Sequence, residues 1–482
     1  MALSILQRPD YTDYRLIPAY SDTIIVVGGG QITGNFRHKY ICEVRMNNLE
    51  GEIDAYAATS IIATLKVPAN ADGNGVFNMN KILRDNVATG VKGIATTTHP
   101  NFSQFASKFN GQDYDNAPHS IHQVDSFCGH RKLIRRVNFT FKEEFATTLT
   151  GAVTTASGSV STGPHAVFNG VLQLEDGFEA FNYIQYVLST TTRKFMTTQP
   201  STYTRKWRSG DFGVLSFLNG RFDSDSTNTN VNSQCRGIRI KTYNSSNSLL
   251  NTIDYELNSN TIGGTTSSGG VDATVPRMFP GIFSHNMVNG ILSVGVGFNN
   301  IEIKNGVQSN VSYYEVFAIN SVGSQKSEKI TIQLTDEDCK GLETIRLAYV
   351  NTLGTWDYFN FYKKSTRKTE IKRSYYRSNY GDYTGSAYIQ SSAEGGKRSF
   401  ATNVEEVIEA NTDFLTEVEV GFMKELFTSP QVYMQVGATT SVQFVPVCVE
   451  EKEYIKQTTA NDMLKQYVIE VRKGHKTRVQ GI

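Results

Sequence analysis

The segment from Arg346 to Tyr362 constrains the fold more than any other stretch of this chain. It predicts two strands joined by a tight Asn/Gly turn, and the second strand is dense in aromatic residues. Aromatic and β-branched side chains favour strands because they pack well on a pleated, half-buried surface. Asp357 is the one acidic residue among these rings. The segment therefore indicates a structural β-region rather than a catalytic loop.

Length and charge narrow the classes of protein to consider. A chain of 482 residues predicts two to four domains. Its 47 Lys and Arg residues against 46 Asp and Glu give a net charge of +1. Phosphate neutralisation requires a clear basic excess, so this balance argues against nucleic-acid binding as a role of the whole chain. An abundance of Ser, Thr, Asn and Gly favours β-structure with many turns.

The cysteines and the apolar runs bear on the cellular environment. The cysteines are scattered and contain no CxxC pair, which predicts free thiols in a reducing cytoplasm. No basic-then-apolar signal opens the sequence, and no apolar run approaches the roughly 20 residues that span a bilayer. We therefore expect no membrane insertion and no export by an ordinary signal. The five cysteines are Cys42, Cys128, Cys235, Cys339 and Cys448.

Three regions are predicted along the chain. Residues 1–110 carry short strands at regular spacing and predict an Ig/fibronectin-like β-domain. Residues 111–335 predict a middle β-domain with long Ser/Thr/Asn-rich loops. Residues 336–482 predict a β-rich domain with one amphipathic helix. The expected fold class is mainly β, with two or three β-sandwich-like domains and a short helix in the C-terminal domain.

The C-terminal helix is predicted from its cap and its periodicity. Residues 411–413, Asn-Thr-Asp, are candidates for the N-cap. Phe414, Val418 and Phe422 lie four residues apart, which predicts that they share one face. A Ser-Pro pair at 429–430 ends the pattern.

Potential metal ligands are densest between residues 119 and 130. A zinc site needs three or four such groups that converge on a tetrahedral point. The spacing shows no helical pattern, so a set of loop histidines, some of them at a subunit contact, is the alternative. The candidate ligands are His119, His122, Asp125, Cys128 and His130.

One basic stripe, interleaved with tyrosines, runs through residues 363–377. Three interpretations fit it: a nucleic-acid-facing strand pair, an exposed edge protected from aggregation by charge, or docking to an acidic partner subunit. The basic residues are Lys363, Lys364, Arg367, Lys368, Lys372, Arg373 and Arg377, with Tyr362, Tyr375 and Tyr376 between them.

Two pairs of adjacent carboxylates, Glu143–Glu144 and Glu405–Glu406, invite a comparison with glycosidases. Those enzymes need two carboxylates that face each other across a cleft. Neighbours in a strand point to opposite faces of the sheet, so we do not expect Glu143 and Glu144 to act as a catalytic pair.

Three sets of turns and aromatic residues resemble a family of virion proteins from tailed phages of Bacteroidetes and marine bacteria, crAss-like phages among them. The resemblance implies a tail or neck component that assembles in multiple copies as a ring with other tail, neck or portal-complex proteins. It also implies synthesis in the host cytoplasm and a place in the virion. The sets are residues 16–22 with 65–77; residues 137–145 with 168–172 and 181–183; and residues 351–354, 357–361 and 426–430.

A ring subunit repeats one heterologous contact around an axis, and such contacts use aromatic anchors within a polar and charged rim. Core packing is the alternative role for the rings. We expect no catalytic residue and no cofactor, and DNA passing near residues 363–377 is a further hypothesis. A receptor- or glycan-binding tail protein and a tail-associated metal-dependent hydrolase are the alternative functions. The predicted interface residues are Trp356, Tyr358, Phe361, Tyr375 and Tyr376, with Lys363, Lys364, Arg367 and Arg373 as the charged rim.

Overall fold

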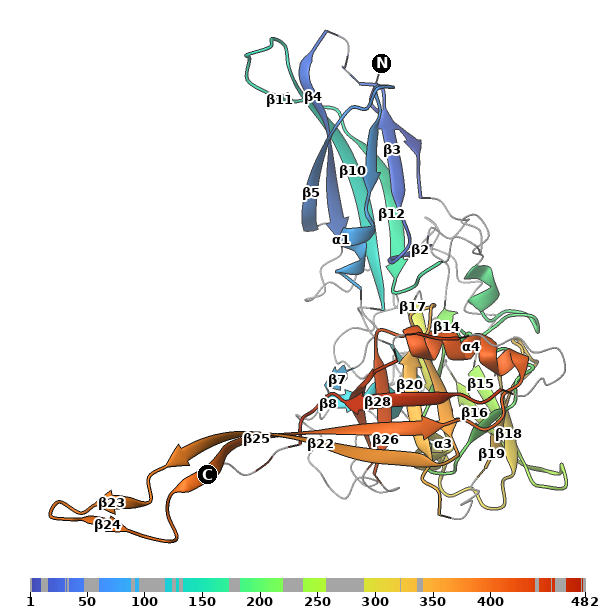
Figure 1. The fold of residues 1–482 in the computed structure, drawn as a ribbon. Helices are drawn as coiled ribbons and strands as arrows, with labels where there is room; N and C mark the ends of the chain where they lie inside the picture. Colours follow the sequence, from blue (N-terminus) through green and yellow to red (C-terminus); the bar gives the residue numbers. More distant parts are fainter. Residues whose placement is uncertain are drawn as a thin grey trace, which may run out of the picture. The chain divides into compact units, whose positions relative to one another are not determined.

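A computed structural model shows that the chain is mainly β, with several multi-stranded sheets and short helices, which confirms the predicted fold class (Figure 1). It divides into two compact units. Unit 1 comprises Met1–Asp336, Val350–Asp357 and Ala438–Ser441, and unit 2 comprises Glu337–Tyr349, Tyr358–Gly437 and Val442–Ile482. The structure describes residues 2–9, 16–30, 32, 34–46, 60–87, 92–94, 118–123, 127–129, 133–172, 183–219, 237–256, 290–320, 322–335, 341–437, 442–451, 453–455, 465–477 and 479.

Two sheets and a short helix form the first part of unit 1. Strand β10 (Ile134–Ala146) shows the alternation expected from its sequence, since Val137, Phe139 and Phe141 are all buried in one core. One sheet has the order β1 (Ser4–Gln7), β3 (Ile24–Gly28), β6 (Gly75–Asn78). The other has the order β2 (Leu16–Pro18), β12 (Val160–Phe168), β10, β4 (Phe36–Met46), β5 (Ser60–Pro68), with β11 (Thr154–Thr155) beside β10 and helix α1 (Asn80–Arg84) following β6.

This sheet continues past the predicted boundary at residue 110. Strand β10 pairs antiparallel with β4, and Phe139 stands opposite Val44. Phe141 stands opposite Cys42 in the same ladder. These apolar pairs bury one face of both strands, so β10 and β12 belong to the N-terminal sheet. The long separation in sequence left no local signal of this pairing.

The second part of unit 1 contains a five-stranded and a three-stranded sheet. Strands β15 (Gly237–Tyr243) and β16 (Leu249–Glu256) pair antiparallel as a hairpin. The five-stranded order is β13 (Arg205–Trp207), β19 (Ile330–Leu334), β18 (Tyr313–Ile319), β15, β16. The other elements are β14 (Val214–Asn219), β17 (Gly290–Gly295) and β9 (Phe127–Gly129) in one sheet, β7 (Lys92–Ile94) with β8 (Pro118–Ser120), helix α3 (Phe298–Asn305), and the 3₁₀ turns η1 (Ile121–Gln123) and η3 (Tyr183–Tyr186).

Unit 2 is organised around a seven-stranded sheet. Every residue of β20 (Ile345–Val350) and β21 (Trp356–Phe361) is buried, so these strands show no alternation between a core face and a solvent face. The strand order is β21, β20, β26 (Val432–Val436), β27 (Gln443–Val449), β28 (Val468–Lys473), β25 (Gly396–Asn411), β22 (Ser365–Ser378). A small hairpin of β23 (Gly381–Tyr383) and β24 (Tyr388–Gln390) follows β22.

Helix α4 (Glu417–Thr428) confirms the predicted C-terminal helix and its end before Ser429, but its start and its buried face differ from the prediction. Thr416 is the N-cap and forms a capping box with Glu419, whereas residue 411 still belongs to β25. Phe414 precedes the helix, so the four-residue count from it does not define a face. Phe414 and Val418 are exposed, and the buried side chains are Glu419, Val420, Phe422, Met423 and Leu426.

Within the described part of the chain, no helix combines the length and the apolar character that crossing a bilayer requires.

Candidate interaction arm

The hairpin of β22 and β25 in unit 2, here called the arm (residues 365–411), is the surface that most clearly lacks a partner. Only Val407–Asn411 of β25 pairs with β28, and Val404 forms one further bridge with Thr477. Beyond that point, among the residues that the structure describes, β22 and β25 pair only with each other (Figure 1). We call residues 371–403 the distal arm and the remaining residues of the arm its root.

The sequence explains why so long a ribbon forms. Strand β22 has 14 residues and includes two Thr, one Ile and two Tyr, whereas β25 has 16 and includes two Val, one Ile, one Thr and one Phe. Residues of these kinds favour strands. A bulge leaves Phe400 outside the pairing, between Ser399, which faces Tyr375, and Ala401, which faces Ser374. Bulges raise the local twist and redirect side chains. Here the rings of Phe400 and Tyr376 lie edge to face, with their centroids 6.4 Å apart.

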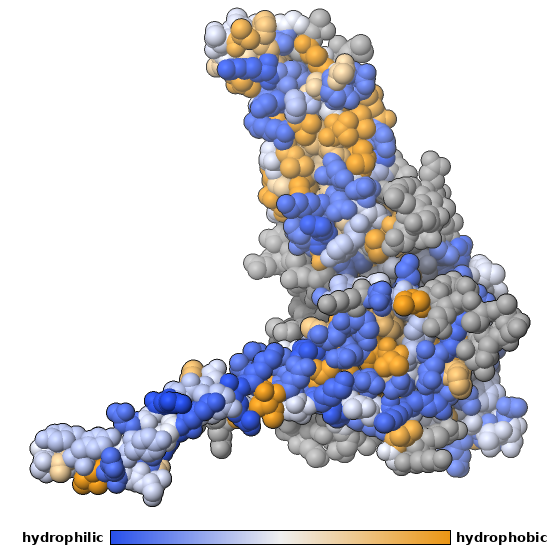
Figure 2. Space-filling view, viewed as in Figure 1, coloured by the Kyte–Doolittle hydropathy of each residue, from blue (hydrophilic) through white to orange (hydrophobic). Residues whose placement is uncertain are grey.

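Large apolar side chains of the distal arm are exposed on this ribbon. Ile371 is 49 % exposed, Tyr375 50 % and Phe400 58 %. Figure 2 shows the arm as a mainly hydrophilic ribbon with hydrophobic residues near its root and at its tip. An isolated two-stranded hairpin is marginally stable in water, so a partner that covers these side chains would stabilise the arm. Further exposed residues, towards the tip, are Tyr380, Tyr383, Tyr388 and Ile389.

The root of the arm is held by a network of ion pairs. Glu370 and Glu405 stand directly opposite each other in the ladder. The Arg472 guanidinium lies between these carboxylates, 3.1 Å from Glu370 and 2.9 Å from Glu405. On the other side of the ribbon, Arg367 pairs with Glu343 and Glu406. Additional pairs join Lys473 to Glu406, Lys368 to Glu409 and Lys476 to Glu405.

These contacts set the charge state of the root. The hydrogen bond from Arg472 holds the pKa of the Glu370 carboxyl below its ordinary value. Burial alone would raise the pKa of Glu406, but hydrogen bonds from Lys473 and Arg367 outweigh burial and lower it. Both carboxylates are therefore ionised at neutral pH, and the root neutralises its own cations.

The distal arm has a different electrostatic character. It carries five basic side chains and two acidic ones. Arg377 stands directly opposite Lys397 in the ladder, so two cations share one face. The Lys397 ammonium lies over the Tyr375 ring, 4.1 Å from its centroid. None of the five forms an ion pair with a described residue; they are Lys372, Arg373, Arg377, Lys397 and Arg398.

The predicted interface residues divide into two groups. Tyr375, Tyr376 and Arg373 are exposed on the distal arm. Arg367 is engaged at the root, and Lys363 pairs with Asp413 at 3.2 Å. Lys364 precedes β22, and its carbonyl accepts a hydrogen bond from Asn411.

The other predicted anchors, Trp356, Tyr358 and Phe361, are buried, which matches the core-packing alternative and leaves them no exposed surface for a partner. Within unit 1, the Trp356 ring lies edge-on to His122, with centroids 4.7 Å apart. Within unit 2, the Arg346 guanidinium lies 4.7 Å from the Tyr358 centroid.

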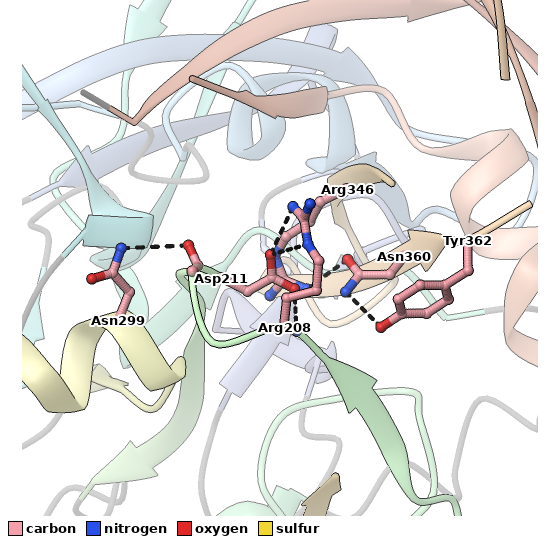
Figure 3. Close-up of polar contacts among 7 residues, drawn as sticks. Arg208, Asp211, Asn299, Arg346, Asn360 and Tyr362 are labelled. Carbon is pink, nitrogen blue, oxygen red and sulfur yellow. Dashed lines mark hydrogen bonds and ion pairs between the residues drawn. The ribbon is translucent and has the colours of Figure 1, made fainter. Parts of the chain in front are cut away.

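Buried charged groups in each unit have internal partners. In unit 2, Arg346 donates a hydrogen bond of 2.9 Å to Asn360, whose amide donates one of 3.0 Å to the Tyr362 hydroxyl (Figure 3). In unit 1, Asp211 is fully buried and pairs with Arg208 at 3.1 Å. These contacts fix the interior rather than present groups to a ligand.

Asp357 is a buried residue whose role the sequence did not reveal. Its carboxylate accepts hydrogen bonds from Thr197, Thr198 and Asn351, all within unit 1. Asn351 opens the tight turn that ends at Thr355, and its side-chain oxygen accepts the N–H groups of Leu353 and Thr355. Asp357 therefore anchors this turn.

The candidate metal ligands are only partly within the described residues. His122 is buried in η1. His119 lies in β8 and Cys128 in β9, whereas Asp125 and His130 lie outside the described residues. Among the residues that the structure describes, no group of three or more His, Cys, Asp or Glu side chains converges as a metal site would require.

The adjacent carboxylates point apart, as predicted for Glu143 and Glu144. Glu143 pairs with His38 at 3.1 Å, and Glu144 pairs with Lys66. Glu405 and Glu406 likewise have different partners at the arm root.

The chain matches no protein-family model, and no curated protein matches it.

Proposed function

We propose that this chain is a structural subunit of a tailed-phage particle, in the tail or neck, which assembles in several copies with other virion proteins. The observation that carries the proposal is the distal arm, a ribbon with exposed apolar side chains that pairs with no other described strand. The resemblance of its turns and aromatic segments to phage virion proteins supports the same role.

An arm of this kind suits assembly because it gains stability when a neighbour covers it. Burial of apolar surface contributes roughly 25 cal/mol per Å² removed from water. A contact between an arm and a different surface of the next copy is heterologous, and such contacts close into rings when the rotation permits. The ion-paired root holds the arm to the sheet of unit 2.

Assembly is tested on the full chain by mass photometry over a range of concentrations. We expect closed oligomers, and we expect the double variant I371S/F400S to remain monomeric with unchanged thermal unfolding. Leu250→Ser is the matched control, because Leu250 is exposed on β16 in unit 1 and not on the arm.

Two results would contradict the proposal. One is a chain that stays monomeric at every concentration and does not associate with the other particle proteins. The other is its absence from mature particles in antibody labelling by electron microscopy. Labelling confined to the tail tip, together with binding to host cells, would favour the receptor-binding alternative.

A further inference from the structure

We infer that the distal arm docks on a carboxylate-bearing surface of a protein neighbour, with Arg377 and Lys397 as its anchor. This inference rests on the proposed assembly role and names the chemistry of the surface that the arm contacts.

The first step is the register of the ladder. Arg377 and Lys397 are direct cross-strand partners, and both are exposed. Side chains directly opposite each other in an antiparallel pair lie about 5 Å apart at Cβ, and like charges there destabilise the hairpin. Arg373 lies on the same face, since residues two or four apart in a strand point the same way. On this face of the free arm, Arg373, Arg377 and Lys397 therefore concentrate positive charge, and none of the three forms an ion pair with a described residue.

The second step is a comparison with another cross-strand pair of like charges in the same arm. Glu370 and Glu405 are also direct cross-strand partners. There the chain supplies the counter-charge itself, because Arg472 of β28 bonds to both carboxylates. Arg377 and Lys397 have no described carboxylate in the corresponding place. By the same chemistry, the missing counter-charge is a carboxylate supplied from outside.

The third step distinguishes a protein from a nucleic acid as the source of that negative charge. Ile371, Arg373, Tyr375 and Arg377 alternate along β22 and share one face, with Lys397 opposite. Ile371 is as exposed as Tyr375. A phosphate backbone offers no apolar surface to an isoleucine, whereas a protein surface offers both carboxylates and apolar contacts. Tyr375 also holds the Lys397 ammonium over its ring, which reduces the freedom lost on docking.

The repulsion between Arg377 and Lys397 is tested by hydrogen–deuterium exchange of the full chain, with protection of the backbone amides of the arm as the readout. Lys397→Glu converts the like-charge pair into an ion pair. We expect protection of the distal arm to rise by about two- to fivefold, with Lys397→Gln intermediate. Unchanged protection in Lys397→Glu would mean that Arg377 and Lys397 do not repel each other, and the inference would fail.

Docking is tested with immobilised poly-L-glutamate and, separately, duplex DNA as probes for the full chain at several salt concentrations. We expect the double variant R377S/K397S to bind poly-L-glutamate about tenfold more weakly than the parent chain. Lys364→Ser, immediately before the arm, is the control and should bind as the parent does. Equal binding by R377S/K397S would overturn the inference, and so would arm-dependent binding that favours DNA over poly-L-glutamate.

The two proposals fail in different ways. If the parent chain stays monomeric and does not join particle proteins, but loses poly-L-glutamate binding in R377S/K397S, the assembly role is refuted and the acidic docking surface remains. If R377S/K397S assembles as the parent chain does, the docking chemistry is refuted and the assembly role remains.

Discussion

The Asp357 carboxylate accepts two hydrogen bonds from Thr198, one of 3.0 Å from its backbone N–H and one of 3.1 Å from its hydroxyl. Asn351 donates a third bond of 2.9 Å to the same oxygen, and the Thr197 hydroxyl bonds to the other oxygen. Asp357 is only 2 % exposed. A buried carboxylate persists where donors replace the water it has lost. This aspartate is therefore a structural anchor.

Replacement of this anchor should destabilise unit 1. In Asp357→Asn an amide group replaces one acceptor oxygen, so at least one donor from Thr197, Thr198 or Asn351 loses its partner. We expect a loss of about 1–3 kcal/mol in unfolding free energy, measured by guanidinium denaturation. Asp72→Asn, on an exposed loop, is the control and should leave the unfolding midpoint unchanged.

The tight turn before β21 should not tolerate a side chain at Gly354. Gly354 has a φ of +73°, and a Cβ there would overlap the Asn169 carbonyl oxygen within unit 1. Gly354→Ala therefore combines backbone strain with a clash against backbone, and we expect a loss of about 2 kcal/mol or more. Thermal unfolding measures the loss. Gly158→Ala has open space around its Cβ and should unfold at the parent temperature.

Local patterns predicted the elements that depend on neighbours in sequence. The turn that begins at Asn351 and the helix that ends before Ser429 were both visible in residue type and spacing. The sheet that joins β4 to β10 was not, because its register depends on contacts about 100 residues apart.

The candidate site shows the same division. The basic stripe and its tyrosines were visible in the sequence, and so was docking to an acidic partner as one interpretation. The sequence did not show that the cations at the root of the stripe form ion pairs, whereas Lys372, Arg373 and Arg377 form none with a described residue. At the root, Arg367 pairs with Glu343 and Glu406, and Lys368 pairs with Glu409. Arg472, which bonds to Glu405, lies 67 residues further along the chain. Only the three-dimensional register shows that Arg377 faces Lys397.

The start of α4 depends on Thr416. Its hydroxyl accepts the Glu419 N–H, and the Glu419 side chain accepts the Thr416 N–H at 2.7 Å. Thr416→Ala removes the side-chain half of this capping box, which should cost about 1 kcal/mol. Faster hydrogen exchange in the first turn of α4 would report the loss. Thr428→Ala, at the other end of the helix, should leave that turn unaffected.

Acid should weaken unit 1 through Glu43. Hydrogen bonds from Lys142 and then Arg45 lower the pKa of its carboxyl. A carboxyl whose pKa is lower in the folded state stabilises the fold above its unfolded pKa of about 4.3. That contribution is lost as the pH falls through the lower folded value. In guanidinium titrations, the stability difference between the parent chain and Glu43→Gln should therefore shrink below about pH 4.3.

A stability difference between these two chains that does not shrink as the pH falls below about 4.3 would contradict this assignment. Asp72→Asn, at an exposed position, again serves as the control variant.

Each unit is built from several separate segments of the chain, which limits how the protein can be divided for experiments. Val350–Asp357 belongs to unit 1, although it follows the first segment of unit 2 in sequence. A fragment that stops at residue 336 would consequently lack Asn351, Trp356 and Asp357, and it would leave Thr198 and His122 without the groups they contact. Residues 371–403 all belong to one segment of unit 2. An internal deletion between Ile371 and Asn403 is therefore a better way to prepare a chain without its distal arm.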